Sequence, residues 1–183
     1  KLWFGGESGL FQYAGGKLID MTAKKDLPSA NVSSLLQGPD GSTWVATMGG
    51  VVRFDSAGSS RLDPFHGFCQ RRAERLYRAR DDAIWFSNAI DAPGAYRYNG
   101  MNWDRIGSED GLLNDQVHGI AETSDGTIWF ATSEGLSRLK GETVVNFTEH
   151  DGLGARIVYD IYADSDDVLW CATDQGVLRF DTK

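Results

Sequence analysis

The chain has few cysteines and histidines, fewer basic than acidic residues, and no long apolar run. Its 183 residues include two cysteines, three histidines, 18 lysines and arginines, and 26 aspartates and glutamates, which gives a formal net charge of −8. A surface this acidic repels phosphate backbones, so nucleic acid is not an expected partner. No stretch approaches the roughly eighteen consecutive apolar residues of a membrane-spanning helix, so direct membrane insertion is not expected.

The cysteines and histidines do not have the spacing of a metal site. His66, His118 and His150 form no H-x-x-x-H pair, and two cysteines, Cys69 and Cys171, cannot make a zinc site alone. The sequence therefore predicts no metal and no cofactor, and the two cysteines do not indicate a redox compartment. No G-x-S-x-G or phosphate-binding loop stands between a strand and a helix, so no catalytic residue is predicted.

Six tryptophans and 22 glycines are the informative residues. Five tryptophans, at 3, 44, 85, 129 and 170, are spaced by 41, 41, 44 and 41 residues. Four residues before each of the last four stands an aspartate: Asp40, Asp81, Asp125 and Asp166. Six residues after the tryptophan a glycine recurs, delayed in the third copy by an insertion within residues 89–93. A period of this length is typical of repeat proteins.

Each repeat predicts four short strands. In the fourth copy these are expected near residues 117–123, 127–132, 136–139 and 142–148, with an Asp-Gly turn between the first two. The second strands, such as Ile128-Trp129-Phe130, are apolar on both faces and must be covered from both sides. Sheets stacked around an axis meet this need, with each tryptophan wedged between neighbours. The predicted fold is therefore all-β: a β-propeller with four-stranded antiparallel blades of about 41 residues.

The repeat predicts one propeller domain over residues 1–183. Its blades are expected at approximately 1–25 (partial), 26–66, 67–110, 111–151 and 152–183 (partial). The predicted strands number eighteen, which is not a multiple of four. We therefore expect four to five blades of a larger propeller; an open arc of five blades, or one completed by another chain, is the alternative. End blades of such an arc expose apolar faces through which the chain could self-associate.

The repeat resembles the two-component regulator propeller repeat. The pattern V-x-x-[IL]-x-x-x-x-D-G-x-[IL]-W-[FV]-[AG]-T-x-x-G-[LV]-x-R-[FYL] fits residues 117–139 and 158–180 almost throughout, and Asp-Gly-Leu at 110–112 and 151–153 fits the same family. The first and third copies depart most, since Asp82 replaces the turn glycine in the third. More distantly, streptogramin lyases have similar propeller repeats.

The resemblance implies the sensor region of a bacterial signal-transduction protein, usually periplasmic or otherwise extracytoplasmic. Such propellers belong to membrane-bound histidine kinases, hybrid regulators and diguanylate cyclases. The implied role is to bind a small molecule, often a carbohydrate fragment. The implied partners are the remainder of the propeller and a downstream signalling domain.

Residues that recur in every repeat are interpreted as structural. The third-strand arginines Arg53, Arg97, Arg138 and Arg179 are expected to pair with carboxylates or carbonyls of an adjacent blade. Asp166 is expected to cap turn amides rather than bind calcium. Cys171 is expected to be a small buried hydrophobe, because it occupies a slot filled by Phe86 and Phe130 in other repeats.

Residues that differ between repeats are the candidates for binding. In a propeller, the connection to the next blade and the loop between second and third strands open at the same face, around the channel mouth. The predicted ligand-binding residues of these loops are Asn31, Arg71, Arg72, Asn88, Asp91, Asn114, Asp115, Glu134, Arg156 and Asp174. Further side chains at this face come from Glu7, Ser29, Met48, Gln116, Tyr159 and Gln175. This polar set suits a hydroxyl-rich or zwitterionic small molecule or a peptide.

Two other functions remain open at this point. A propeller lyase or hydrolase would need a histidine and a carboxylate from different blades within hydrogen-bond reach, such as His66 or His150 with Asp115 or Glu134. A protein-interaction scaffold would instead show a broad apolar patch.

Overall fold

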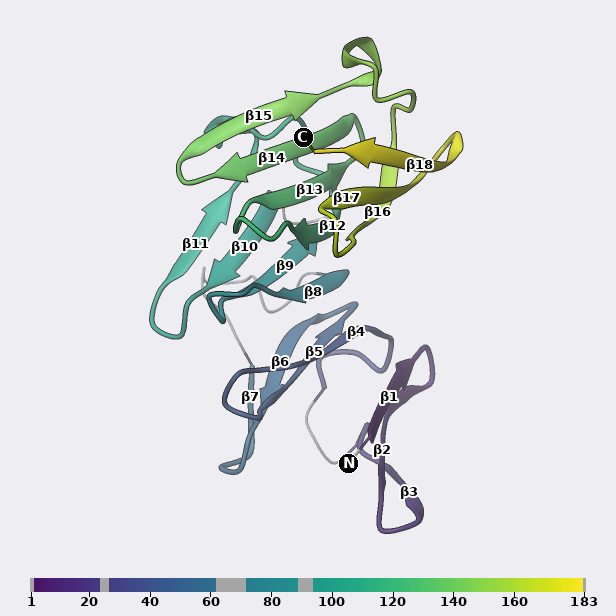
Figure 1. The fold of residues 1–183 in the computed structure, drawn as a ribbon. Helices are drawn as coiled ribbons and strands as arrows, with labels where there is room; N and C mark the ends of the chain where they lie inside the picture. The colour runs from purple at the N-terminus through teal and green to yellow at the C-terminus, as the bar shows by residue number, and fades with distance from the viewer. Residues whose placement is uncertain (1, 24–26, 62–71, 89–93, 183) are drawn as a thin grey trace. The chain divides into compact units, whose positions relative to one another are not determined.

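The computed structural model describes residues 2–23, 27–61, 72–88 and 94–182 (Figure 1). Their regular structure consists of eighteen β-strands and two short 3-10 turns, and in these ranges no helix is long and apolar enough to cross a bilayer. The chain divides into two compact units, Lys1–Arg78 and Ala79–Lys183. Each unit is described by itself.

Unit 1 contains two antiparallel sheets and one further strand. The first sheet, in the order β1-β2-β3, is three-stranded: β1 (Leu2–Gly6), β2 (Gly9–Ala14) and β3 (Lys17–Asp20). The second, in the order β4-β5-β6-β7, is four-stranded: β4 (Val32–Gln37), β5 (Thr43–Thr47), β6 (Gly50–Phe54) and β7 (Ser59–Arg61). The last strand of the unit is β8 (Arg75–Arg78), the first strand of the third repeat.

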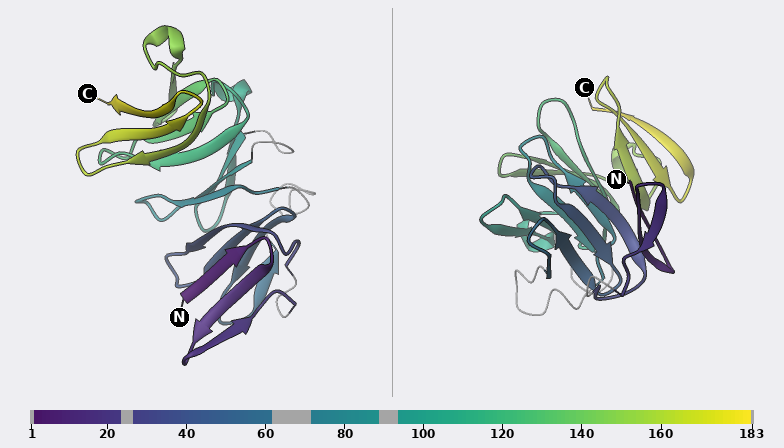
Figure 2. Two further views of the ribbon diagram at one scale, coloured as in Figure 1. Left: turned by 90° about the vertical axis from the view of Figure 1, so that its right-hand side faces the viewer. Right: turned by 90° about the horizontal axis from the view of Figure 1, so that it is seen from below.

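Unit 2 contains the rest of the third repeat and the two that follow, as neighbouring sheets packed face to face (Figure 1; Figure 2). The third repeat contributes β9 (Ile84–Asn88), β10 (Gly94–Tyr98) and β11 (Trp103–Ile106). The fourth forms the sheet β12-β13-β14-β15: β12 (Val117–Glu122), β13 (Ile128–Thr132), β14 (Gly135–Lys140) and β15 (Thr143–Phe147). The fifth forms the sheet β16-β17-β18: β16 (Val158–Ala163), β17 (Val168–Thr173) and β18 (Gly176–Asp181). The 3-10 turns η2 (Ser108–Asp110) and η3 (Glu149–Asp151) precede β12 and β16.

The strands of the described residues follow the order that the sequence predicts. There are four first strands, five second, five third and four fourth, and those of the fourth repeat begin and end within a residue or two of expectation. The insertion at residues 89–93, between β9 and β10, lies outside the described residues. Every residue of β9 and of β13 is buried, which confirms that these second strands are covered on both faces.

The recurring tryptophan packs between neighbouring sheets. Within unit 2 the ring of Trp85 meets Phe130 edge-on at 5.4 Å, and Trp129 meets Phe180 at 5.8 Å. Both tryptophans are at most 5% exposed, whereas Trp170 of the last sheet is 42% exposed. Truncating a buried ring of this size typically costs about 3–5 kcal/mol, so each wedge is a major part of the stability.

Cys171 is fully buried in the cluster that joins the last two sheets, as predicted for a small hydrophobe. Burial in this apolar cluster raises the pKa of its thiol to about 11, so the group is protonated and unreactive at neutral pH. Cys69 lies outside the described residues.

The recurring aspartate caps the turn between first and second strands in three repeats. One carboxylate oxygen of Asp40, Asp81 and Asp125 accepts a bond from the amide two residues ahead. In the last sheet the prediction for Asp166 is wrong, because Asp164 takes the amides of Asp166 and Val168 and the indole N–H of Trp170. Asp164 stands at the first position of the turn, where its carboxylate reaches all three donors.

The recurring arginines pair within their own sheet, so the prediction of contacts to an adjacent blade is wrong for Arg53 and Arg97. Arg53 pairs with Asp40, and Arg97 pairs with Asp81 at 2.6 Å. The cause is the strand register, which places each arginine directly opposite the tryptophan of its own second strand. From there the guanidinium reaches the turn aspartate of the same sheet.

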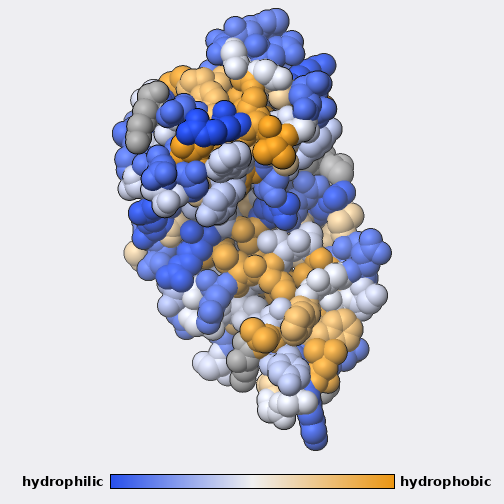
Figure 3. All heavy atoms as spheres, turned by 45° about the vertical axis from the view of Figure 1, so that its right-hand side comes forward, coloured by the Kyte–Doolittle hydropathy of each residue, from blue (hydrophilic) through white to orange (hydrophobic). Residues whose placement is uncertain are grey.

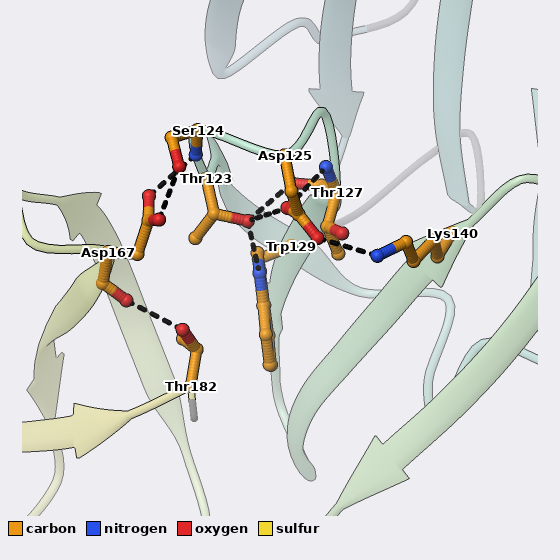
Figure 4. A network of polar contacts seen from close by, with 8 residues as sticks. All are labelled: Thr123, Ser124, Asp125, Thr127, Trp129, Lys140, Asp167 and Thr182. Carbon is orange, nitrogen blue, oxygen red and sulfur yellow. Dashed lines mark hydrogen bonds and ion pairs between the residues drawn. The ribbon is translucent and has the colours of Figure 1, made fainter.

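In the fourth repeat a lysine, rather than the recurring arginine, pairs with the turn aspartate (Figure 4). Lys140 replaces the arginine as the partner of Asp125, at 2.7 Å, and the guanidinium of Arg138 lies 5.9 Å above the ring of Trp129. The neighbouring turn is tied to this one, since Asp167 accepts from the backbone N–H of Ser124 at 2.6 Å and also from its hydroxyl. These bonds lock the turns of two adjacent sheets together.

We predict that Asp40→Asn removes a small acid-dependent part of the stability. The hydrogen bonds from Ser42, together with Arg53, lower the pKa of Asp40 to about 2. Stability from such a group is present above its ordinary pKa and is lost as pH falls through the lowered one. The loss should stay under about 1 kcal/mol, because the pair is exposed to solvent. Urea unfolding at pH 4 and pH 2 measures it; equal pH dependence in the variant and the parent would contradict the assignment.

In the third repeat, no described residue accepts a hydrogen bond from the indole N–H of the tryptophan. Trp44 Nε1 donates to Ser42, and Trp129 Nε1 donates to Thr123. The corresponding positions in the third repeat are Ala83 and Ala79, and Trp85 Nε1 is buried with no acceptor among the described residues. A buried donor without a partner costs about 1–3 kcal/mol.

We therefore predict that Ala83→Ser raises the free energy of unfolding by about 1 kcal/mol, because it supplies the acceptor that Ser42 supplies to Trp44. Chemical denaturation measures the change. In a Trp85→Phe background the same substitution should give no gain, which isolates the hydrogen bond from packing. Equal gains in both backgrounds would contradict this explanation.

Candidate ligand-binding surface

The loops between second and third strands lie beside the connections that lead into the first strands. One backbone hydrogen bond recurs. Its donor is the N–H of the residue four positions after the tryptophan, and its acceptor is the carbonyl of the residue thirteen positions before the tryptophan. It joins Met48 to Asn31 at 3.0 Å in unit 1, and in unit 2 Ser133 to Gln116 at 3.2 Å and Asp174 to Ile157 at 3.1 Å. Both classes of loop therefore meet at the same end of each sheet, as the sequence predicts.

A second recurring contact closes these loops. The hydroxyl of the threonine three residues after the tryptophan donates to the carbonyl of the following glycine: Thr47 to Gly50, Thr132 to Gly135 and Thr173 to Gly176, at 2.8–3.0 Å. The hydroxyl oxygen of each threonine also accepts a hydrogen bond from the backbone amide two residues further along the chain. These bonds use the backbone amides of the two residues between the threonine and the glycine but not their side chains, so those side chains can vary.

A chain of polar side chains crosses this end of unit 2. Ser133 Oγ lies 2.8 Å from Gln116 Oε1 and 2.9 Å from His118 Nε2. His118 is in β12, and its ring lies 6.2 Å from that of Tyr159, which is half exposed on β16. An amide, a hydroxyl, an imidazole and a phenol from two neighbouring sheets thus form one surface.

Ser133 is the central member of this polar chain. The Ser133 hydroxyl has a single proton, and it donates that proton to Gln116. His118 Nε2 lies 2.9 Å from the same hydroxyl oxygen, so Ser133 joins the amide to the imidazole.

Charged side chains surround the surface. Glu134, Arg156 and Asp174 are exposed in the adjoining loops and connections. Asp174 also accepts the amide of Ile157 at 3.2 Å through one carboxylate oxygen, which fixes its position beside the connection.

Other predicted residues of unit 2 hold the backbone. Asn114 accepts the amide of Gln116 at 2.8 Å. Asp115 accepts both the amide and the hydroxyl of Ser108, at 2.6 and 2.8 Å. Asn88 is fully buried at the end of β9, in the place that threonine holds in the second, fourth and fifth repeats. The polar groups of Asn114 and Asp115 are thus engaged inside the protein, and Asn88 is buried away from solvent.

Two predicted residues lie in unit 1. The carbonyl of Asn31 receives the recurring bond from Met48, and Arg72 pairs with Glu74 at 3.0 Å. Arg71 and Asp91, as well as the alternative catalytic His66, lie outside the described residues.

The proposed catalytic pairs of histidine and carboxylate are not supported by the described contacts. His150 is exposed and lies 3.8 Å from its neighbour Glu149, while Asp115 is bound to Ser108. In the described ranges no group of three or more His, Cys, Asp or Glu side chains could hold a metal ion.

Sequence reasoning missed His118 and Ser133 as parts of this surface. The signal was present, because the position eleven residues before the tryptophan holds Ser33, Glu74, His118 or Tyr159. A strand position that is polar and different in each copy is unlike the rest of the repeat. This position indicates a shared surface only once the structure shows that its residues lie at the same end of their sheets.

Cavities of the described parts also occur at the opposite end, beside the aspartate turns. One of about 920 Å³ in unit 1 is lined by Trp3, Asp40 and Arg53 among others, and one of about 670 Å³ in unit 2 by Asp81, Trp85 and Arg97 among others. The arginines and turn aspartates in these cavities already pair with each other. We interpret the two cavities as solvent-filled spaces between sheets.

Comparison with known proteins identifies the repeat and the fold. Residues 26–49 and 111–134 match the family model described as two component regulator propeller. The extracellular domain assigned to the hybrid two component system BT3049 from B. thetaiotaomicron superposes with a TM-score of 0.84 at 20% identity, over 99% of this chain and 26% of that chain. The chain is built of β-propeller blades, and two of its segments match the two-component regulator repeat.

Other propellers are similar in structure. The extracellular domain assigned to the one component system BT4673 from B. thetaiotaomicron has a TM-score of 0.78 at 18% identity, over 97% of this chain and 25% of that chain. A catalytically inactive virginiamycin B lyase from Staphylococcus aureus with quinupristin has a TM-score of 0.66 at 15% identity, over 97% of this chain and 64% of that chain. The chain spans about a quarter of the length of the two extracellular domains. The comparison with curated proteins yields no match.

We predict that Asp115→Ala destabilises the propeller by about 1–2 kcal/mol, because the amide and hydroxyl of Ser108 lose their acceptor. Chemical denaturation measures the change. Glu134→Gln, an exposed substitution in a neighbouring loop, is the control and should stay within about 0.5 kcal/mol of the parent. Equal stabilities of the two variants would show that Asp115 does not hold the connection.

Proposed function

We propose that this chain is a sensing module of a bacterial signal-transduction protein. It binds a small hydroxyl-rich molecule, such as a carbohydrate fragment, without chemical turnover. The likeness to extracellular domains assigned to two-component systems supports this role and an extracytoplasmic location. The remainder of a larger propeller and a downstream signalling domain would be its partners.

The observation that carries the proposal is the polar chain Gln116–Ser133–His118 beside Tyr159. Sugar hydroxyls both donate and accept hydrogen bonds, which an amide, a hydroxyl and an imidazole can match. The apolar C–H face of a sugar packs on an exposed aromatic ring, and Tyr159 offers one. Small-molecule sites typically combine a small number of polar groups in fixed positions with an aromatic surface.

The surrounding charges define the chemistry further. Glu134 and Asp174 present carboxylates, and Arg156 presents a cation. A ligand with hydroxyl groups and a separate charge of either sign would therefore find a partner here. Of the residues predicted from sequence, these three are our candidates for direct contact.

The surface also offers a route for signal transmission. Its residues come from β12, from β16 and from the loops that follow β13 and β17. A ligand that touches His118 and Tyr159 bridges two neighbouring blades and favours one spacing between them. Such a rigid-body shift could be passed to a downstream domain without any covalent step.

We predict that a thermal-shift screen of oligosaccharides against the protein finds at least one stabilising sugar. His118→Ala and Tyr159→Ala should each weaken its binding about tenfold, as measured by calorimetry, since each removes a direct contact. Tyr162→Ala is the matched control, because it removes an exposed tyrosine from the same strand outside the polar chain.

If no sugar of any class shifts the unfolding temperature, the carbohydrate proposal is wrong. If a sugar is bound and then cleaved, the surface is catalytic, and the lyase-like propellers are the better guide to its function.

A further inference from the structure

Two phenylalanine rings enclose the ring of Trp129. Phe147 comes from β15 of the same sheet, and its ring lies 5.6 Å from that of Trp129. Phe180 comes from β18 of the last sheet, and its ring lies 5.8 Å from that of Trp129 and 5.2 Å from that of Phe147. The three rings form one aromatic cluster between the fourth and last sheets.

The junction between the third and fourth sheets has aliphatic residues at both phenylalanine positions. Ile106 stands at the position of Phe147, because the two strands pair with their neighbours in the same register. Leu139 stands at the position of Phe180, because each lies opposite the residue that precedes the tryptophan of its own sheet. Ile106, Leu139 and Trp85 line the cavity of about 670 Å³ described above. This junction therefore leaves room beside its tryptophan where the next junction places two rings.

The lining of this cavity combines an apolar part with exposed carboxylates. Ile128 is buried, and Ile106, Leu139 and Val144 are half-buried. The carboxylates are all exposed and outnumber the guanidinium groups by two to one. The charged side chains of the lining are Asp81, Asp104, Asp110, Glu142, Arg97 and Arg105.

The two guanidinium groups do not neutralise these carboxylates. Arg97 is shared between Asp81 at 2.6 Å and Asp104 at 3.3 Å. Arg105 pairs with Glu109, which does not belong to the lining. Among the residues that the structure describes, Glu142 forms no ion pair. A cation is therefore the charged group that this lining favours.

Hydrophobic residues also reach the surface elsewhere, as Figure 3 shows for one side of the protein. The exposed apolar side chains of the first and last sheets are where the remainder of a larger propeller would pack, so they do not point to a ligand. The cavity beside Trp85 is different, because both of the sheet faces that form it are described and all its lining residues belong to unit 2.

We propose that this cavity binds a small aromatic amine, that is, an arylalkylammonium ion. The ring of the ligand takes the room that phenylalanine rings occupy beside Trp129, and it packs on Ile106, Leu139 and Val144. An apolar group that displaces loosely held solvent from such a space gains affinity. The ammonium group of the ligand lies among the exposed carboxylates, beside Glu142. This site is at the aspartate-turn end of the sheets, so it is independent of the polar chain at the other end.

The experiment is a titration of the protein with phenethylamine, followed by the chemical shifts of the protein amides. The dissociation constant should be about 1 mM, as expected of so small a ligand. Hydrocinnamate carries the same ring with a negative charge, and butylamine carries the ammonium group without a ring. Each of these two compounds should bind about tenfold more weakly than phenethylamine or not at all.

Leu139→Phe is the decisive variant, because it places in the cavity the ring that Phe180 supplies to the next junction. Binding of phenethylamine should weaken about tenfold or more, since the ligand ring loses its room. Glu142→Gln should weaken it about threefold, because the ion pair is exposed to solvent. Leu18→Phe is the matched control: it makes the same substitution at an exposed leucine of unit 1, and it should bind like the parent.

Far-ultraviolet circular dichroism checks that all variants are folded, and Ile106→Phe makes the same test if Leu139→Phe does not fold. A parent that shows no binding of phenethylamine up to about 10 mM would overturn the proposal. So would equal binding of hydrocinnamate or butylamine, because the proposal requires both the ring and the positive charge. Unchanged binding by the folded phenylalanine variant would place the ligand elsewhere and overturn it as well.

Discussion

The burial of one indole ring between two neighbouring sheets is the interaction on which the rest of the structure depends. Each sheet presents its tryptophan on one face and a set of aliphatic and aromatic side chains on the other, so unlike faces meet at every junction described within unit 2. The second strands β9 and β13 are therefore buried on both sides. Turn aspartates and third-strand cations then hold the polar ends of the same strands within each sheet.

This arrangement separates residues that maintain the fold from residues that are free to differ. Tryptophans, glycines and turn aspartates recur, and their contacts lie between sheets or at the aspartate turns. At the other end of the sheets, backbone bonds and a threonine hydroxyl fix the loops. Gln116, His118, Ser133 and Tyr159 can therefore have side chains chosen for recognition, because the backbone there does not depend on them.

Much of the fold could be predicted from sequence because the repeated segments of this one chain can be aligned with each other. The strand order, the Trp85 and Trp129 wedges and the burial of Cys171 follow from positions that recur. The partners of the arginines could not be predicted, since only the strand register shows that Arg97 stands opposite its own Trp85. Asp164 was missed because two aspartates compete for the same turn amides, and geometry alone decides between them.

The candidate surface was predicted less well than the fold. Loop polarity selected Glu134, Arg156 and Asp174, which are exposed, but it equally selected Asp115, whose carboxylate holds Ser108, and Asn88, which is buried. Whether a polar side chain supports its own loop or faces solvent depends on distances of a few ångströms. The sequence gives His118 no role in this surface, and only its bond from β12 to Ser133 shows the connected polar side chains.

The recurring backbone bond between loop and connection has a consequence for engineering. Because it uses only main-chain atoms, as between Ser133 and Gln116, substitutions at those two positions leave the anchor in place. A library that randomises the loop and strand-entry positions of each blade should thus keep a high fraction of folded members. The blade edge would serve as a scaffold for selecting new specificities, in the way that hypervariable loops are diversified on an immunoglobulin domain.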